Sequence, residues 1–170
     1  LALSNPAQAS CDDPPKAGVD WAGCDLAQSQ HPGAVLHDAF LDGVDLSKAS
    51  LAGAELQRAL LTQANLAAAD LSGANLMRAT LSQAKLTQAN LSGAILTEAS
   101  LTGADLSGAD LSHSNLNGAF LEEAILKGAD LTGATLDLTI LSGADFSGAT
   151  WHDGTLCAPE SIGRCRQEPN

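Results

Sequence analysis

A five-residue repeat of leucine constrains the fold of this chain more than any other feature. From Leu36 to Leu156 every fifth residue is large and apolar, and twenty-three of these twenty-five residues are Leu, the other two being Phe146 and Trp151. Ala precedes the large residue by two positions in twenty-one of the twenty-five units. The unit is therefore Ala-x-Leu-x-x, and because it repeats without an insertion it predicts a regular structure built from equivalent short segments.

This period is incompatible with a helix and with a flat strand. In an α-helix five residues advance by about 500°, or about 140° beyond a full turn, so the leucines would spiral round the helix. In a flat strand, side chains alternate with a period of two, and every second Leu would face the wrong way. A coil satisfies the pattern if Ala and Leu point inward and Gly, Ser, Asn or Asp form a turn after each unit. We therefore expect an all-β solenoid whose coils pair at a spacing of about 4.8 Å.

Units such as Ala64-Asn65-Leu66 and Ala69-Asp70-Leu71 resemble the A(D/N)LXX consensus of pentapeptide-repeat proteins. The resemblance implies a right-handed quadrilateral β-helix with four pentapeptides per coil. It covers residues 34–156, and degenerate units extend it to about residue 19. We expect residues 1–18 to be a signal-peptide remnant or an N-terminal tail and cap, residues 19–156 to form the solenoid, and residues 157–170 to form a C-terminal cap and tail, with a short helical turn at 158–164.

The predicted interior leaves no room for a ligand, because Leu fills the centre and Ala lets the backbone approach closely. None of the four histidines, His31, His37, His113 and His152, pairs convincingly with a catalytic partner, and the neighbours His37-Asp38 and His152-Asp153 occupy outward or turn positions without a cleft that would exclude water. The sequence also lacks the glycine-rich motifs of nucleotide-binding loops and of calcium-binding β-rolls. We therefore expect a protein that is not an enzyme, with no catalytic residue, no cofactor and no metal site.

The four cysteines lie only at the two ends of the chain. Three pairings are formally open, and the local bridges Cys11–Cys24 and Cys157–Cys165 are favoured because a rod would hold the two pairs far apart. Since disulfides persist under oxidising conditions, we expect an exported protein of the periplasm, thylakoid lumen or extracellular space. The segment 7–9, Ala-Gln-Ala, has the form of a signal-peptidase site, although an ordinary N-terminal tail explains it equally well.

The ends of a solenoid expose an apolar cross-section and unpaired backbone groups, which invite association with another chain. Trp21 and Trp151 occupy inward positions near the two ends, and each lies beside a segment that a disulfide would close. We interpret both tryptophans as end plugs.

Residues twenty apart stack in columns if each coil holds four units, and the residue before each Leu then points outward. One such column contains four large apolar residues, which form a candidate interaction strip for a protein partner or a homodimer. Two alternatives stand beside this hypothesis: isolated exposed apolar side chains are common, and the N-terminal segment could cover the first two residues. The strip consists of Phe40, Leu60, Phe120 and Ile140.

The charge excludes some partners and suggests another. Eight Lys and Arg against twenty Asp and Glu leave a net charge of −12, which opposes direct binding to nucleic acid. No apolar run approaches the ~20 residues of a membrane helix, so membrane insertion is not expected. Acidic residues also gather in neighbouring columns, as in family members that mimic DNA and act on gyrase, although such residues equally bond to turns and keep a rod soluble. This candidate acidic face consists of Asp70, Asp105, Asp110, Asp130 and Asp145.

The preferred interpretation is a non-enzymatic exported scaffold that binds a protein partner through its side faces. The alternative is a DNA-mimicking modulator of a type II topoisomerase. Residues 34–156 hold fourteen acids and five bases, a net charge of −9. Over a rod of about 30 Å this is roughly half the charge density of duplex DNA, which carries one charge per ~1.7 Å.

Overall fold

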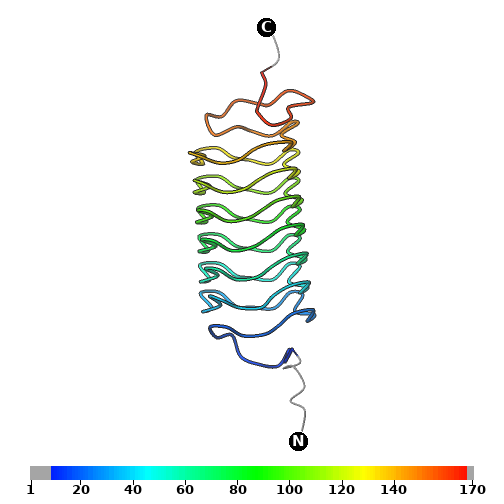
Figure 1. Ribbon diagram of the computed structural model, residues 1–170, viewed down its shortest axis with the longest axis vertical. Coiled ribbons are helices and arrows are strands. Elements are labelled where there is room, and N and C mark those ends of the chain that lie inside the picture. Colours follow the sequence, from blue (N-terminus) through cyan, green and yellow to red (C-terminus); the bar gives the residue numbers. More distant parts are fainter. Residues whose placement is uncertain (1–8, 168–170) are drawn as a thin grey trace, which may run out of the picture.

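Residues twenty apart in the sequence lie one above the other along a straight rod (Figure 1). The computed structural model describes residues 9–167. Parallel bridges join successive coils from Asp20 and Phe40 at one end to Asp130 and Thr150 at the other. Twenty residues per coil correspond to four pentapeptides, and the fold is the expected right-handed quadrilateral β-helix. The residues that the structure describes contain isolated bridges and turns but no helix or longer strand.

The four sides of the rod are named here by the residues that form their bridges. Face A holds residues 20 to 140 in steps of twenty, and face B holds residues 25 to 145. Face C holds residues 30 to 150, and face D holds residues 35 to 135. Each column is one residue wide, so every face is a ladder of single bridges.

A turn at each corner redirects the chain after the Leu of each unit. The carbonyl oxygen of Leu36 accepts a hydrogen bond of 3.1 Å from the N–H of Ala39, and Asp38 between them has a φ of 60°. Such a bond with a positive φ at the third residue defines a type II turn. Every fifth residue from Gly18 to Gly148 has a positive φ, which explains the frequent Gly at this position.

The interior is a stack of Leu and Ala. Every Leu of the repeat from Leu36 to Leu131 has an exposed fraction of 1% or less. Removing one such side chain from water contributes about 2 kcal/mol, so the repeat itself supplies the main stabilising term. Ser114 replaces Ala at one inward position, and its buried hydroxyl has no hydrogen-bond partner within the described residues.

The N-terminal end is closed by residues 10–18 and a disulfide. Cys11 and Cys24 are bonded, with their Cα atoms 5.6 Å apart. Trp21 is 1% exposed, and its Nε1 donates a hydrogen bond of 3.1 Å to the carbonyl oxygen of Asp13. The expected signal-peptidase motif at residues 7–9 falls largely outside the described residues. Residues 9–167 contain no helix with the length and hydrophobicity of a membrane span.

The C-terminal end departs from the sequence pattern. After Thr150 the chain reverses, so that Leu156 pairs antiparallel with Thr150 and Ile162 pairs antiparallel with Asp145. Leu156, the last residue of the periodic series, is therefore 66% exposed instead of buried. The helical turn expected at 158–164 is wrong, because this pairing and the Cys157–Cys165 disulfide hold the segment in an irregular loop with one turn at 159–160.

Candidate interaction surfaces

Face A brings the four strip residues together as two separate pairs. Phe40 bridges to Leu60, and Phe120 bridges to Ile140, with two polar rungs of the same column between the pairs. Phe40 is 49% exposed and Leu60 is 37% exposed, so residues 9–18 do not cover them. Phe120 and Ile140 are each 40% exposed. Face A thus offers two apolar contact points at different heights on one side of the rod.

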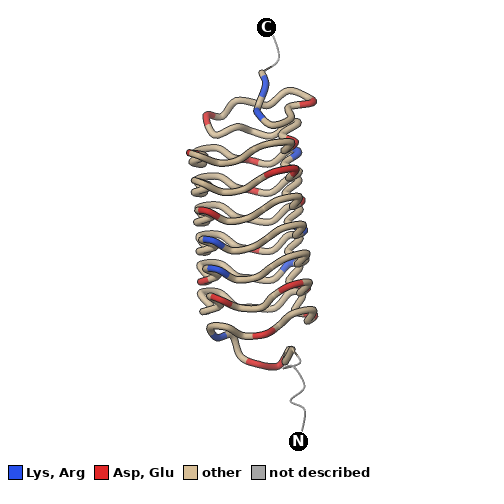
Figure 2. Tube along the Cα trace, viewed as in Figure 1, with Lys and Arg blue, Asp and Glu red and all other residues tan. Residues whose placement is uncertain are grey.

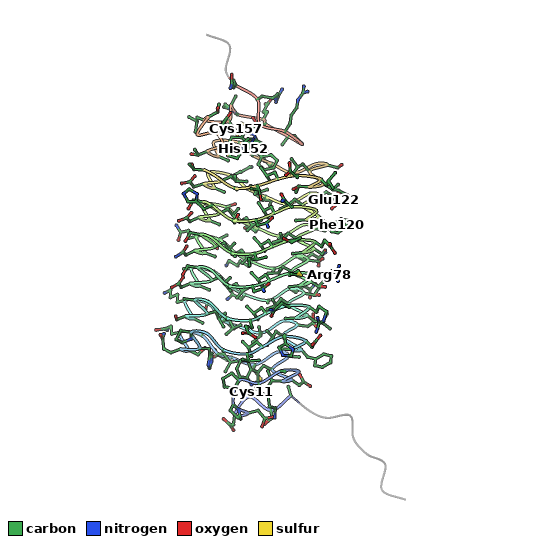
Figure 3. All side chains as sticks on the ribbon, turned by 90° about the vertical axis from the view of Figure 1, so that its left-hand side faces the viewer. Cys11, Arg78, Phe120, Glu122, His152 and Cys157 are labelled. Carbon is green, nitrogen blue, oxygen red and sulfur yellow. A yellow bond between two sulfur atoms is a disulfide. The ribbon has the colours of Figure 1, made fainter. Side chains whose placement is uncertain are left out.

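Acidic side chains border the apolar pair nearer the C-terminus. Glu122 and Glu123 follow Phe120 in the same turn region, and Figure 3 shows Phe120 and Glu122 on one side of the rod. The hydroxyl of Thr102 donates a hydrogen bond of 3.4 Å to Glu122. The pair thus combines exposed apolar surface with carboxylates on one side.

The candidate acidic residues occupy two adjacent faces. Each carboxylate accepts a hydrogen bond of 2.8–3.0 Å from the backbone N–H two residues later, as expected for Asp beside a turn. Bonds from the hydroxyl and backbone of Thr132 lower the pKa of Asp130. The turn thus accounts for the orientation of these side chains. Asp105 and Asp145 lie on face B, and face C carries Asp70, Asp110 and Asp130.

Ion pairs between neighbouring coils occupy the corner that follows face D. Arg58 makes two bonds to Asp38, of 2.7 and 2.6 Å, and Arg78 bonds to Glu98 at 2.7 Å. The hydrogen bond from Arg58 lowers the pKa of Asp38 to about 2. Figure 2 shows how few basic residues the rod carries among its acidic ones. Both arginines of this corner, Arg58 and Arg78, are therefore paired with carboxylates of the rod itself.

The histidines are not brought together. His31 packs against Trp21 with ring centroids 5.1 Å apart, and His37 lies 3.0 Å from the neighbouring Asp38. His113 and His152 belong to other coils nearer the C-terminus. No cluster of three or more His, Cys, Asp or Glu able to hold a metal ion occurs within residues 9–167.

The two tryptophans have different environments. Trp21 is buried beneath the N-terminal loop, whereas Trp151 is only partly buried and packs edge-on against Phe146 with ring centroids 5.0 Å apart. Trp151 and His152, the latter labelled in Figure 3, form one wall of a recess of about 450 Å³ at the C-terminal end. The rest of its lining comes from the last complete coil, through Ala134, Thr135, Leu136, Asp137 and Leu141.

Sequence reasoning missed the apolar residues around this recess. Leu138 is 91% exposed, and Ile162 on the cap is 50% exposed. The sequence contains a signal for the exposure of Leu138, because this residue stands at the positive-φ corner position, which Gly and polar residues occupy in most other units. Thr139 beside it replaces the usual Ala.

Comparison with known proteins identifies similar repeats. The signature described as Pentapeptide repeats matches in eight copies over residues 41–76, 74–112 and 104–143. No curated protein matches the chain.

Solved structures give a similar result. Rfr23, a pentapeptide repeat protein from the cyanobacterium Cyanothece 51142, is 40% identical over 57% of this chain and 63% of its own, with a TM-score of 0.42. This chain thus spans less than two thirds of Rfr23. HetL from Nostoc sp. strain PCC 7120, involved in heterocyst differentiation regulation, is 33% identical over 82% of this chain and 86% of its own, with a TM-score of 0.32. Trypsin-treated QnrB1, a plasmid-mediated fluoroquinolone resistance protein, is 19% identical over 80% of this chain and 68% of its own, with a TM-score of 0.51, a likeness that concerns the fold alone.

Proposed function

The chain belongs to the pentapeptide-repeat family, and from this premise we propose that it is an exported, non-enzymatic rod that binds a protein partner. Proteins of this family are generally non-enzymatic structural or interaction proteins. The observation that carries the proposal is the filled interior, because buried side chains, nearly all of them Leu and Ala, occupy it from Leu36 to Leu131. Only the outer walls and the two ends remain for contact with another molecule.

The partner is proposed to bind face A. The pair Phe120 and Ile140 supplies aromatic and aliphatic surface of the kind that anchors interfaces, and Glu122 and Glu123 border it. The partner's matching surface would carry apolar side chains with Lys or Arg around them. The second pair, Phe40 and Leu60, lies four and three coils below Phe120 and extends the contact along the rod.

A pair of matched variants tests this surface. The immobilised protein is used to capture binding proteins from the compartment in which it resides, and the captured proteins are identified by mass spectrometry. We expect Phe120→Asp to lose the specific partner and Ile95→Asp to retain it, because Ile95 is similarly exposed at 37% but lies on face D. Equal capture by both variants would contradict binding at face A.

The compartment is proposed from the disulfides. The structure joins Cys11 to Cys24 and Cys157 to Cys165, and bridges of this kind indicate an oxidising environment. Cell fractionation of the native protein tests export, and mass measurement after alkylation without reductant tests the bridges. Recovery in the cytosol with alkylated thiols would refute this part of the proposal.

A second candidate function is that of a DNA-mimicking modulator of a type II topoisomerase. Its supporting observation is the accumulation of acid toward the C-terminus, with nine carboxylates and one basic residue from Glu98 to Asp153. The hydrogen bonds to the turns explain these carboxylates without a partner, which favours the first proposal. A gyrase supercoiling assay with the purified protein distinguishes the two, since the first proposal predicts no effect.

A further inference from the structure

Face A carries a similar group of side chains twice. Residues 39–42 read Ala-Phe-Leu-Asp, and residues 119–122 read Ala-Phe-Leu-Glu. In each group an aliphatic residue lies one coil beyond the Phe on face A, and the acid lies at the corner that follows this face. We call the two groups the N-terminal subsite, which is Phe40, Leu60 and Asp42, and the C-terminal subsite, which is Phe120, Ile140 and Glu122.

The two subsites are four coils apart. Phe40 and Phe120 belong to the same column, in which each coil adds twenty residues. At about 4.8 Å per coil, four coils span about 19 Å. Both aromatic side chains are exposed, at 49% and 40%, and the rungs between the subsites carry the polar residues Thr80 and Ser100. A partner that contacts both subsites must therefore present two apolar groups about 19 Å apart along the rod.

The two edges of face A differ in charge. At the corner that follows face D, Arg58 and Arg78 are paired with carboxylates of neighbouring coils. At the corner that follows face A, the carboxylates of Asp42, Glu122 and Glu123 form no ion pair within the part of the chain that the structure describes. Each subsite thus has uncompensated negative charge on the same side. This arrangement is complementary to Lys or Arg on one flank of an apolar stripe.

The backbone of face A is already hydrogen-bonded between coils. The N–H of Phe120 donates to the carbonyl oxygen of Ala99, and the carbonyl oxygen of Phe120 accepts a bond from the N–H of Leu101. The other face A residues from Phe40 to Ile140 are bonded in the same way. An extended segment on this wall would leave its own backbone groups unpaired against apolar side chains. An α-helix satisfies these groups internally, so the wall favours a helix over a strand.

The period of an α-helix fits both spacings on face A. Residues i and i+4 lie on one side of a helix and about 6 Å apart along its axis, close to the spacing of one coil within a subsite. Residues i and i+14 are about 21 Å apart along the axis and differ in direction by only about 40°. A helix inclined by about 25° to the rod would bring this length to the 19 Å between the subsites, a value of about four coils.

Building on the proposed function of face A, we propose that its partner is a basic amphipathic α-helix of about twenty residues that lies along the rod and contacts both subsites. Its apolar residues stand at i, i+4, i+14 and i+18. Lys or Arg on one flank faces Asp42, Glu122 and Glu123. Contact at one subsite raises the effective concentration of the helix at the other, so the affinity depends on the interval between the two apolar pairs.

A synthetic peptide of about 22 residues is the probe, with Leu at these four positions, Lys on one flank and Ala or Gln elsewhere. Fluorescence anisotropy measures its binding to the oxidised protein. We expect Phe40→Asp and Phe120→Asp each to weaken binding at least tenfold. Ile95→Asp on face D is the matched control and should bind the peptide like the wild type. Circular dichroism should show helix forming on mixing, a signal of the peptide because residues 9–167 contain no helix.

A second peptide of the same composition tests the interval. Its second Leu pair is moved to i+16 and i+20, which turns that pair by about 200° away from the first. We expect it to bind the wild type at least tenfold more weakly than the first peptide. Equal binding of the two peptides would overturn the proposal, as would equal binding of the first peptide to Phe40→Asp and to the wild type.

Salt dependence tests the charged flank. Asp42→Asn and Glu122→Gln should each weaken binding of the first peptide and reduce its dependence on salt concentration, because they remove carboxylates that face Lys. Glu55→Gln on face D is the control and should leave both unchanged. An unchanged salt dependence in Asp42→Asn and Glu122→Gln would contradict the assignment of the basic flank.

Deletion of residues 80–99 changes the distance between the subsites and preserves the repeat. The subsites are then three coils apart, about 14 Å. The preferred peptide should change to one with Leu at i, i+4, i+11 and i+15, because eleven residues make about three turns and 16.5 Å. An unchanged preference would overturn the proposal, and if the shortened chain does not fold, the aspartate variants of the intact chain decide it.

Failure of the helix is separable from failure of the proposed function. If the first peptide does not bind and Phe120→Asp still loses the partner captured from its compartment, the helix is refuted and binding at face A stands. If Phe120→Asp retains that partner, binding at face A is itself refuted.

Discussion

At the scale of single residues, the position of a Leu in the repeat decides its energetic role. Leu91 lies in the middle of the rod and is 0% exposed, whereas Leu138 at the C-terminal corner is 91% exposed. The two residues differ in burial and not in chemistry, which makes them a matched pair for measuring the contribution of the core.

We expect Leu91→Ala to lower the free energy of unfolding by about 2–5 kcal/mol, because it removes buried methyl groups and leaves a cavity. Leu138→Ala should change the stability of the monomer by no more than about 0.5 kcal/mol. Leu91→Asp should prevent folding, since a buried unpaired carboxylate costs several kcal/mol. Denaturant titration followed by circular dichroism measures all three, and a folded Leu91→Asp protein would contradict the sealed core.

The corner residues allow a test of backbone conformation alone. Gly73 has a φ of 62°, and a Cβ added there would meet no atom within 4 Å. Gly73→Ala should therefore lower stability by about 1 kcal/mol through the left-handed conformation and not through a clash. Ala68, with a φ of 55°, provides the reverse substitution, and Ala68→Gly should not destabilise the rod. Equal melting temperatures for Gly73→Ala and the wild type would refute this explanation of the glycines.

At the scale of elements, the two caps differ from the coils because they depend on covalent and side-chain contacts outside the repeat. At the N-terminus, residues 10–18 are held by the Cys11–Cys24 disulfide and by the bond from Trp21 to Asp13. The regular coils that follow this N-terminal segment are held together by backbone hydrogen bonds between equivalent positions of neighbouring coils. Reduction should therefore affect the ends before it affects the middle.

The double variant Cys11→Ser, Cys24→Ser should lose about 3 kcal/mol of local stability at the N-terminal end, the usual contribution of a bridge that closes a loop of this size. Hydrogen exchange should show faster exchange for the amides of Trp21 and Leu26 than in the wild type. The amides of Leu86 and Leu91 in the central coils serve as the internal control, and equal acceleration there would contradict a local role for the bridge.

His31 makes the N-terminal end sensitive to pH. Its Nε2 is buried without a hydrogen-bond partner in the described residues, and desolvation lowers its pKa below the ordinary 6.5. The unfolded chain therefore binds a proton at a higher pH than the folded chain, so stability is full above about pH 6.5 and falls as the pH drops below it.

Melting temperatures measured between pH 7.5 and pH 5 test this prediction. We expect a smaller decrease on acidification in His31→Asn than in the wild type. His37→Asn is the control, because His37 is partly exposed and lies beside Asp38. An identical decrease in the wild type and His31→Asn would show that another group is responsible.

The sequence predicts the coils well and the C-terminal end poorly, for a physical reason. Each coil forms because Ala and Leu are buried and a turn follows them in every unit. The five-residue period of the sequence shows this pattern directly. The reversal after Thr150 depends on antiparallel pairing between distant residues, which the period does not encode, so Leu156 continues the pattern in sequence but not in space. Likewise, the columns place Phe120 beside Ile140, but the exposure of Leu138 follows from an incomplete layer above it.

At the scale of the whole molecule, the rod is quasi-one-dimensional, because each coil contacts only the coils next to it. Removing one complete coil should therefore be tolerated if the register is preserved. Deletion of residues 80–99 joins Ala79 to Ser100 and Leu101, which restores the Ala-x-Leu unit. The shortened chain should fold and lose about 5 Å of length, measurable by small-angle X-ray scattering.

Deletion of residues 80–97 is the control for register. It removes eighteen residues, so inward Ala and Leu would meet turn positions of the neighbouring coil. We expect this variant to aggregate or to melt far below the twenty-residue deletion. Comparable folding of both variants would mean that the coil does not depend on its five-residue unit.

The coil length of four whole pentapeptides has a consequence for how such a molecule can change over generations. Gain or loss of one pentapeptide between Leu60 and Phe120 would preserve the inward Ala and Leu positions. It would also rotate every later residue by about 90° about the long axis of the rod, onto the neighbouring face. The two apolar pairs of face A, which now face the same direction, would then face perpendicular directions. Insertion or deletion of single pentapeptides can therefore change the direction in which a surface residue of the rod faces without changing the fold.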